Sequence, residues 1–428
     1  MPLIFEKAGR KMHTRSDCRI CHSTNIEKYL DFGEMPLAGG FLTKEQLKEE
    51  QLFPLNVYYC KNCTASEVLD IVPREILFKQ YFYMSSATKT LSEHFERFAK
   101  EIKEKYLKNK KGLVLEIGSN DGILLKPLMD LGVNALGVDP ALNVVRIAEE
   151  KGCRVVKEFF TPEVAEKISK KEGQAEIITA SNVFAHVDDM DELMKAIKIM
   201  LAEEGTFVIE VHYVLDLVKK MQYDTIYHEH FSYYTVKSLQ RLFERYGMEI
   251  FKVERIPIHA GSIRVFSRNK RKGNKAIERQ VKALLEEEKK AGLHSFNAYV
   301  EFAEKVKKQK NQLNSILSKL KKEGKKIVGY GAAGRGNTLL NYCKIGRETL
   351  DYVVDASPLR QNKFIPGMHI PIVAPEKMRE SPPDYALLLA WSYFNEVMKK
   401  EQEFLKKGGK FVIPLPRPRI IGVKDLQA

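Results

Sequence analysis

The feature that most constrains the fold is a pattern that occurs twice, once in each half of the chain. Each copy is a short apolar strand, a turn with glycine and the start of a helix, in "GLVLEIGSNDGILLKPL" (residues 112–128) and "KKIVGYGAAGRGNTLL" (residues 325–340). A second apolar strand follows each copy and ends in aspartate, at Asp139 and at Asp355. Such glycine turns lie at the carboxyl end of a strand in a parallel sheet. The sequence therefore predicts an α/β protein with two Rossmann-like sheets.

The remaining patterns divide the chain into four regions. A length of 428 residues is long for a single core. Further strands, "AEIITASNV", "GTFVIEV" and "GSIRVFSRN", extend the first sheet, and a stretch rich in Lys, Glu, Leu and Ala predicts two long helices. The predicted regions are a small module at 14–75, an α/β domain at 76–271, a helical bridge at 272–325 and a second α/β domain at 326–428.

Cysteine spacing defines the small module. Cys18 and Cys21 form one Cys-x-x-Cys pair, and Cys60 and Cys63 form another. Two such pairs can supply four thiolates to one tetrahedral zinc ion, which leaves no position for water, so one structural zinc is predicted. Two unrelated redox pairs are the alternative. Disulfides are not expected, because the chain starts without an apolar signal segment.

Composition and charge are typical of a globular protein without a membrane span. Hydrophobic residues make up 44% of the sequence, and no apolar run approaches the length of a membrane helix. The start, "MPLIFEKAGRKMH", lacks a signal core, so a cytoplasmic location is expected. The net charge of +14 suggests nucleic acid, but much of the lysine alternates with glutamate, as on solvated helix faces. No nucleic-acid or membrane partner is expected, and a monomer is compatible with the sequence.

The first glycine turn, "EIGSNDG", is a candidate cofactor site. Gly118 and Gly122 let the backbone approach a ligand, and the carboxylate of Asp139 can accept hydrogen bonds from both hydroxyls of a ribose. Where a dinucleotide site needs its middle glycine, this turn has Asn120. This favours S-adenosylmethionine, which has no pyrophosphate, over NAD. A structural turn without a ligand is the alternative.

The second turn, "GYGAAGRG", predicts a diphosphate site. Gly329, Gly331 and Gly334 follow the G-x-G-x-x-G pattern, and Arg335 is placed to pair with an anion at the helix N-terminus. NAD and a nucleotide sugar both contain a diphosphate, so the motif predicts the group and not the molecule. A glycine turn without a ligand is again the alternative.

A third segment, "YDTIYHEHFSYY" (residues 223–234), gathers two histidines, two acids and five aromatic rings. His228 and His230 are two residues apart, whereas the helical zinc-protease motif needs histidines four apart, so a metal site is not favoured. On an extended segment the two rings would share one face. A proton-transfer site and a polar surface turn are the remaining interpretations.

Several motifs together resemble a known family. They are the two Cys-x-x-Cys pairs, "YFYMSS", "EIGSNDG", "NVFAHVDD", "YHEHFSYY", "IHAGSIRVF" and "GYGAAGRGN", and they cover nearly the whole chain in order. The chain resembles the three-domain S-adenosylmethionine-dependent sugar C-methyltransferases of deoxysugar biosynthesis. The resemblance implies a class I methyltransferase domain in the middle and a nucleotide-linked 4-keto-deoxysugar, bound between the last two domains and methylated at carbon 3. One departure is Ala260, where the pattern would have glycine.

The implied reaction gives the third segment a role. A ketone acidifies the neighbouring carbon, so the site needs a base, a donor for the enolate and an aligned methyl group. His230 is predicted as the base, Glu229 to orient or assist it and Tyr227 as the donor, with His228 as a rival base. His186 is placed in the active site by the resemblance, and a histidine in a surface loop is the alternative. Tyr83 is expected to close over the substrate; Tyr81 in the same motif, or core packing of either ring, is the alternative. Phe231, Tyr233 and Tyr234 are assigned mainly to packing.

The remaining contacts follow from the two turns and the resemblance. The residues predicted to contact the cofactor are Glu116, Gly118, Asn120, Asp121, Gly122, Asp139, Pro140 and Asn182. Those predicted to contact the substrate are Tyr83, His228, Gly331, Arg335, Gly336, Asn337 and Asp355. Two other functions remain open at this point: an NAD-dependent nucleotide-sugar oxidoreductase and a zinc-containing RNA-binding methyltransferase. Against the latter, no stretch alternates arginine with stacking aromatic residues.

Overall fold

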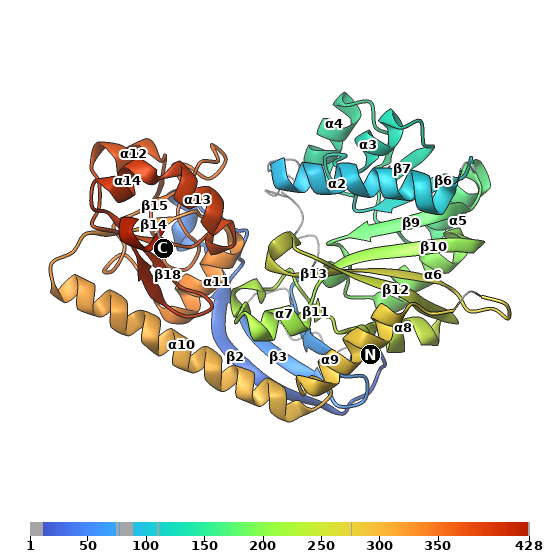
Figure 1. The fold of residues 1–428 in the computed structure, drawn as a ribbon, viewed down its shortest axis with the longest axis horizontal. Helices are drawn as coiled ribbons and strands as arrows, with labels where there is room; N and C mark the ends of the chain where they lie inside the picture. The colour runs from blue at the N-terminus through green and yellow to red at the C-terminus, as the bar shows by residue number, and fades with distance from the viewer. Residues whose placement is uncertain (1–11, 74–76, 78–88, 109–110, 275, 427–428) are drawn as a thin grey trace.

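The chain forms two lobes joined by an N-terminal module and a long helix (Figure 1). The computed structural model describes residues 12–73, 77, 89–108, 111–274 and 276–426. In Figure 1 the middle domain and the C-terminal domain face each other, and β2 and β3 of the N-terminal module run below and between them. The predicted α/β class, with two Rossmann-like sheets, is confirmed.

The middle domain is built on a seven-stranded sheet. Five parallel strands lie in the order β8-β7-β6-β9-β10, and the sheet continues with β13, which is antiparallel to both neighbours, and β12. In sheet order the strands are β12 (Met248–Ile256), β13 (Ser262–Asn269), β10 (Leu201–His212), β9 (Ala175–Ser181), β6 (Leu113–Ile117), β7 (Ala135–Val138) and β8 (Val155–Val156).

Helices cover both faces of this sheet. Successive strand residues point to opposite faces, so neighbouring residues of one strand pack against different helices. Val114 packs in one core with α2 and α3, whereas its neighbour Leu115 packs in another with α5 and α6. The helix α6 starts where the Asp189 carboxylate accepts a hydrogen bond from the Glu192 N–H (2.8 Å). The helices are α2 (Lys89–Glu101), α3 (Leu125–Asp130), α4 (Leu142–Glu150), α5 (Pro162–Glu172), α6 (Met190–Met200), α7 (Val214–Lys219) and α8 (Val236–Arg245).

The C-terminal domain has a six-stranded sheet in the order β16-β15-β14-β17-β18-β19, parallel except for β19. Its strands are β14 (Ile327–Tyr330), β15 (Val353–Val354), β16 (Ile372–Val373), β17 (Tyr385–Leu388), β18 (Lys410–Ile413) and β19 (Arg419–Ile421). Its helices are α11 (Gly334–Cys343), α12 (Glu376–Glu380), α13 (Phe394–Lys400) and α14 (Gln402–Lys406). The stretch predicted as two helices before this domain contains α9 (Arg279–Lys290) and α10 (Phe296–Lys322).

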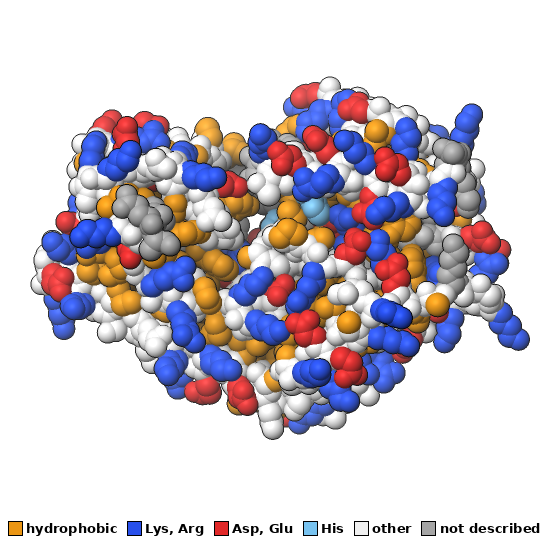
Figure 2. All heavy atoms as spheres, in the orientation of Figure 1, with side chains coloured by type: hydrophobic (Ala, Val, Ile, Leu, Met, Phe, Trp, Pro, Cys, Tyr) orange, Lys and Arg blue, Asp and Glu red, His pale blue; other side chains and the backbone are white. Residues whose placement is uncertain are grey.

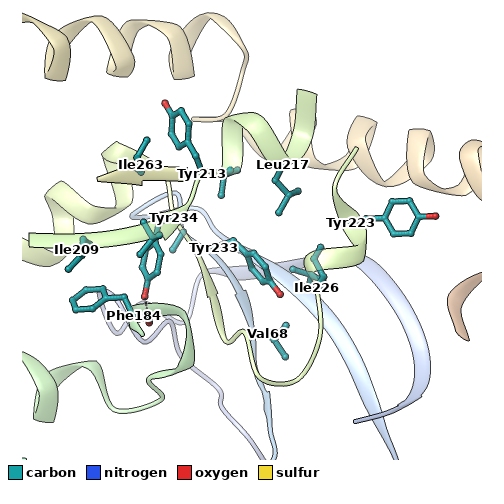
Figure 3. Close-up of a cluster of buried hydrophobic side chains, with 14 of the residues drawn as sticks. Val68, Phe184, Ile209, Tyr213, Leu217, Tyr223, Ile226, Tyr233, Tyr234 and Ile263 are labelled. Atoms are coloured by element: carbon teal, nitrogen blue, oxygen red, sulfur yellow. Dashed lines mark hydrogen bonds between the residues drawn. The ribbon is translucent and has the colours of Figure 1, made fainter. Parts of the chain in front are cut away.

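The N-terminal module is an antiparallel sheet that takes its fourth strand from the middle of the chain. The strands β2 (Ile26–Pro36), β3 (Leu52–Cys60) and β4 (Ser66–Val68) are followed in the sheet by β11 (Ser232–Tyr233). Figure 3 shows the rings of Tyr233, the last residue of this strand, and of Tyr234 among buried side chains, and the Tyr234 hydroxyl donates to the Phe184 carbonyl (2.9 Å). The segment "YHEHFSYY" is therefore joined to two domains. Among the described residues, no helix has the length and apolar character needed to cross a membrane.

Candidate active site

A cavity of about 530 Å³ lies at the carboxyl ends of β6, β7 and β9. Its volume is typical of a site for a small ligand. His186 lines it together with six of the residues predicted to contact a cofactor, which are Glu116, Gly118, Asn120, Asp139, Pro140 and Asn182. Asp121 and Gly122 lie behind the turn: a Cβ on Gly122 would be 2.8 Å from the Cys153 sulfur. These two residues therefore support the turn from inside.

The turn between β6 and α3 has a shape that requires glycine at one position. Gly118 has φ +68°, and a Cβ there would lie 2.3 Å from Cγ2 of Val183. The Asp139 carboxylate accepts hydrogen bonds from the N–H groups of Asn120 (2.8 Å) and Ala141 (2.9 Å). Burial raises the pKa of Asp139, and the two N–H groups oppose this shift. Asp139 thus shapes the turn in addition to facing the cavity.

Residues distant in sequence complete the cavity. His13 and the stretch 71–73 of the N-terminal module line it, as does Phe231. The His13 ring is 3.4 Å from the Asp188 carboxylate, which ties this edge of the module to the segment after His186. No local pattern marks these residues as ligand contacts, and the sequence did not identify them.

The segment from Tyr227 to His230 forms a turn, and its side chains point to different surroundings. The His228 ring bonds the Pro54 carbonyl (3.1 Å) and packs against Phe53, so it faces the N-terminal module. The Glu229 carboxylate faces Gly39, whose N–H bonds it. Burial raises the pKa of Glu229 to about 7, and the Gly39 N–H limits the rise. The structure does not bring the His228 ring or the Glu229 carboxylate to the His230 ring.

Four histidine rings form a chain beside the cavity. The centroid distances are 4.9 Å from His186 to His230, 5.4 Å from His230 to His212 and 5.5 Å from His212 to His259. Burial is the main cause that lowers all four pKa values, to about 4 for His186 and His259 and well below the usual value for His212 and His230. The rings are therefore neutral near pH 7. Figure 2 shows histidine atoms beside the hollow between the two lobes.

Hydrogen bonds determine which nitrogen of His230 carries the proton. Nδ1 lies 2.8 Å from the Thr225 carbonyl oxygen, which can only accept, so Nδ1 donates. Nε2 of the neutral ring is then an acceptor, and the Tyr227 hydroxyl at 3.0 Å donates to it. His186 is oriented by the main chain, since its Nδ1 lies 2.7 Å from the Glu229 carbonyl oxygen. His230 and Tyr227 are thus arranged as a base and a hydroxyl that can exchange a proton.

The second glycine turn lies on the other side of the histidine chain. Arg335 pairs with Asp224 (3.1 Å) and lies over the Trp391 ring, while the Asp355 carboxylate accepts from the Ala332 N–H (2.7 Å). The Asn337 amide donates to the Ala38 carbonyl of the N-terminal module. Gly331 and Gly336 pack closely: a Cβ on them would lie 2.6 Å from Ala390 and 2.9 Å from Leu389. The predicted substrate residue Tyr83 lies outside the described residues.

The four cysteines of the N-terminal module form one cluster. Their sulfurs lie within 4.8 Å of one another, with 3.5 Å between Cys18 and Cys63 and 3.6 Å between Cys21 and Cys60. Four sulfurs at about 2.3 Å from a tetrahedral zinc would be roughly 3.8 Å apart, so the cluster fits this ion.

Comparisons with known proteins identify the family. Three family models match consecutive parts of the chain: "Putative zinc binding domain" at 18–78, "Methyltransferase domain" at 88–253 and "C-methyltransferase C-terminal domain" at 257–416. A curated relative, C-methyltransferase NovU of Streptomyces niveus, is 35% identical over 410 residues, which are 96% of this chain and 97% of NovU. The chain belongs to the C-methyltransferase family. The predicted resemblance is confirmed, and this C-methyltransferase is an S-adenosylmethionine-dependent enzyme.

Two further known proteins match only part of this chain. A ubiquinone biosynthesis O-methyltransferase of Bartonella bacilliformis is 29% identical over 100 residues, which are 22% of this chain and 39% of that protein. The solved structure of the CcbJ methyltransferase from Streptomyces caelestis is 15% identical, with a TM-score of 0.33, and covers 41% of this chain and 90% of its own.

Four residues of the C-methyltransferase site were not assigned a role from the sequence: His212, Asp224, His259 and Trp391. His212 ends β10, and His259 follows β12 with φ +54°. The neighbouring Ala260 also has positive φ (+67°), and its carbonyl accepts from Gln222 (2.8 Å). The position of His212 at the end of a parallel strand is the one sequence signal that could have marked it.

Proposed function

We propose that this C-methyltransferase methylates carbon 3 of a nucleotide-linked 4-keto-deoxysugar. The observation that supports this most is the hydrogen-bonded pair of Tyr227 and neutral His230, next to His186 at the cofactor cavity. Transfer of a methyl group to carbon needs a proton to be removed first, and a ketone at carbon 4 makes the carbon-3 proton removable. When bound, S-adenosylmethionine supplies the electrophilic methyl group.

The Tyr227 hydroxyl lies on the lone pair of His230, so the proton reaches the imidazole through Tyr227. This relay replaces the role of enolate donor predicted for Tyr227 from the sequence. The C3–H bond breaks as the Tyr227 oxygen takes the proton, and the tyrosine's own proton moves to Nε2. The C–H electron pair moves to the ketone oxygen as an enolate, and Tyr227 ends neutral with an imidazolium at His230. The Thr225 carbonyl stabilises that cation through Nδ1–H.

The nucleotide is proposed to bind between the last two domains. Arg335 and the N-terminus of α11 offer positive charge for a diphosphate, and the histidine chain lies between this helix end and the cofactor cavity. Glu229 acts differently from the orienting role predicted for it, because its carboxylate holds Gly39 of the N-terminal module while its carbonyl orients His186.

The four-cysteine cluster is proposed to hold one structural zinc ion. All four positions are sulfur, so the ion would stabilise the module and take no part in chemistry. Metal analysis of folded protein should give about one zinc per chain, and Cys60→Ser should fold poorly without metal. Full folding of that variant in a chelator would contradict the proposal.

Isotope exchange tests the proposed reaction without methyl transfer. In heavy water, the wild-type enzyme with S-adenosylhomocysteine should exchange the carbon-3 hydrogen of a thymidine or uridine diphosphate-linked 4-keto-deoxyhexose for deuterium. His230→Ala should lose exchange and methylation by roughly 10²–10⁴-fold while still binding both ligands. Tyr227→Phe should lose both as well, because the path to Nε2 is interrupted.

His228→Ala is the comparison on the same turn, since its ring faces Phe53 and should matter much less than His230. If His228→Ala or His186→Ala abolishes exchange while His230→Ala keeps it, the base is misassigned. If the wild-type enzyme exchanges none of these sugars, the proposed substrate class is wrong.

A further inference from the structure

A short turn of the middle-domain chain is held by the C-terminal domain. This turn, Tyr223–Thr225, precedes Tyr227 and His230. Asp224 in it is buried, with 1% of its side chain exposed, and both carboxylate oxygens accept hydrogen bonds from the other domain. Arg335 donates to Oδ1 (3.1 Å), and the Trp391 indole donates to Oδ2 (2.7 Å).

Other contacts hold the same turn to the C-terminal half of the chain. The Thr338 hydroxyl of α11 donates to the Ile226 carbonyl (3.3 Å). The Tyr223 hydroxyl donates to Gln309 of α10, whose amide donates to the Pro414 carbonyl (2.7 Å). The position of the turn is therefore set from outside its own domain.

The turn Tyr223–Thr225 also fixes the position of the proposed base, His230. The Thr225 carbonyl, one peptide away from Asp224, accepts the Nδ1 proton of His230 (2.8 Å). That contact sets both the tautomer and the direction of the ring, and so the position of Nε2. A displacement of about 1 Å in a reacting group can cost on the order of 10²-fold in rate.

We propose that Asp224 is a positioning residue through which the C-terminal domain holds His230 in its reactive orientation. The inference rests on the proposed function, because it concerns the same proton transfer. It assigns the C-terminal domain a role in catalysis in addition to binding. Arg335 is also the expected partner of the substrate diphosphate, so occupation of the substrate site and placement of the base depend on one guanidinium.

Carbon-3 exchange with separate kcat and KM values tests the inference. Asp224→Asn keeps the shape and an acceptor for the indole but loses the charge that pairs with Arg335. It should lower kcat for exchange by roughly 10- to 100-fold and change KM for the nucleotide sugar by less than about threefold. Trp391→Phe removes one donor and keeps a ring under Arg335, so it should lower kcat by a smaller factor.

Glu401→Gln is the matched control. Glu401 is a buried carboxylate of the C-terminal domain that also lies between an aromatic donor, the Tyr330 hydroxyl (2.8 Å), and an arginine, Arg379 (3.7 Å). The Glu401→Gln variant should leave kcat for exchange unchanged.

The outcomes separate the two proposals. Absence of exchange in the wild-type enzyme overturns the proposed function. Wild-type exchange with an unchanged kcat in Asp224→Asn, or with a change in KM alone, overturns the positioning role. If Asp224→Asn does not fold, Trp391→Phe decides: a wild-type kcat in that folded variant overturns the inference, and a lowered kcat with unchanged KM supports it.

Discussion

The two glycine turns of this enzyme share a hydrogen-bond plan. Gly118 donates to the Val138 carbonyl and Gly331 to the Val354 carbonyl, both at 2.8 Å. The residue after each of these valines is an aspartate, Asp139 or Asp355. Each aspartate carboxylate accepts one hydrogen bond from an N–H of its glycine turn and one from the N–H of the residue two positions after the aspartate. In both turns a Cβ on the glycine would collide with the second residue after a neighbouring strand, Val183 after β9 and Ala390 after β17.

The turns differ in length and in charge. Helix α3 begins seven residues after Gly118, whereas α11 begins three residues after Gly331. The longer turn borders a cavity whose lining includes five acids besides Glu116, which suits a cationic cofactor: Asp139, Glu158, Asp188, Asp189 and Glu192. The shorter turn brings a helix N-terminus and Arg335 to the strand end, which suits a diphosphate. We therefore expect the length of the loop to the helix, more than the glycine pattern, to determine which ligand each turn binds.

Alanine at each glycine should break one site and spare the other. Gly118→Ala and Gly331→Ala both place a Cβ in a left-handed backbone (φ +68° and +88°) at 2.3 and 2.6 Å from a neighbour. Each should lower the free energy of unfolding by about 2–5 kcal/mol, from backbone strain and overpacking. Only Gly118→Ala should abolish S-adenosylmethionine binding by calorimetry. Loss of that binding in folded Gly331→Ala would show that the turns are not independent.

The acid two residues before Gly118 has no counterpart in the second turn, where Gly329 lies. Burial first, and then the charges of Asp139 and Asp121, raise the pKa of Glu116 well above its usual value. Such a group stabilises the fold below its unfolded pKa of about 4.5, and this contribution is lost as pH rises toward the folded pKa.

Glu116→Gln should therefore remove a pH dependence of stability. Wild type and variant should unfold alike near pH 4, and the variant should gain stability over wild type by up to about 1.4 kcal/mol per pH unit above that. Urea unfolding from pH 4 to 8 measures this difference. Parallel pH profiles would mean that Glu116 is not held in its acid form.

The two aspartates give the next test. Asp139→Ala should weaken S-adenosylmethionine binding by roughly tenfold or more, because ribose hydroxyls lose an ionised acceptor (about 1–3 kcal/mol). Asp355→Ala loses the equivalent N–H contacts but should leave that affinity unchanged in calorimetry. Equal weakening by both variants would mean that Asp139 acts only by shaping its turn.

The sequence predicted the two sheets and the cysteine cluster because their signals are local. A strand, a glycine turn and a helix are contiguous, and so is each Cys-x-x-Cys pair. The same reasoning selected eight residues as cofactor contacts, and six of them line the cavity.

Contacts between distant segments were beyond that reasoning. Asn337 bonds Ala38 across 299 residues, and Arg335 bonds Asp224 across 111. The surroundings of His228 depended on whether its segment is extended. The segment forms a turn, and β11 then pairs with the N-terminal sheet shortly after it. His212 and His259 meet only through the order of β12, β13 and β10, which no short pattern encodes.

The smallest expected effect concerns the open helix end of the second turn. Ala333 is the N-cap of α11, with extended backbone (φ −97°, ψ 155°) and no side-chain cap. Ala333→Ser should add a hydroxyl acceptor for the first turn of the helix and raise the free energy of unfolding by about 1 kcal/mol. If a diphosphate binds at this helix end, the hydroxyl competes for the same N–H groups, so affinity for a nucleoside diphosphate should fall a few-fold. Denaturant unfolding and calorimetry with thymidine or uridine diphosphate measure the two effects. S-adenosylmethionine affinity serves as the control, because its turn is unchanged. A stabilised variant with undiminished diphosphate affinity would place the anion away from α11, and the second turn would then be a structural copy of the first without a ligand.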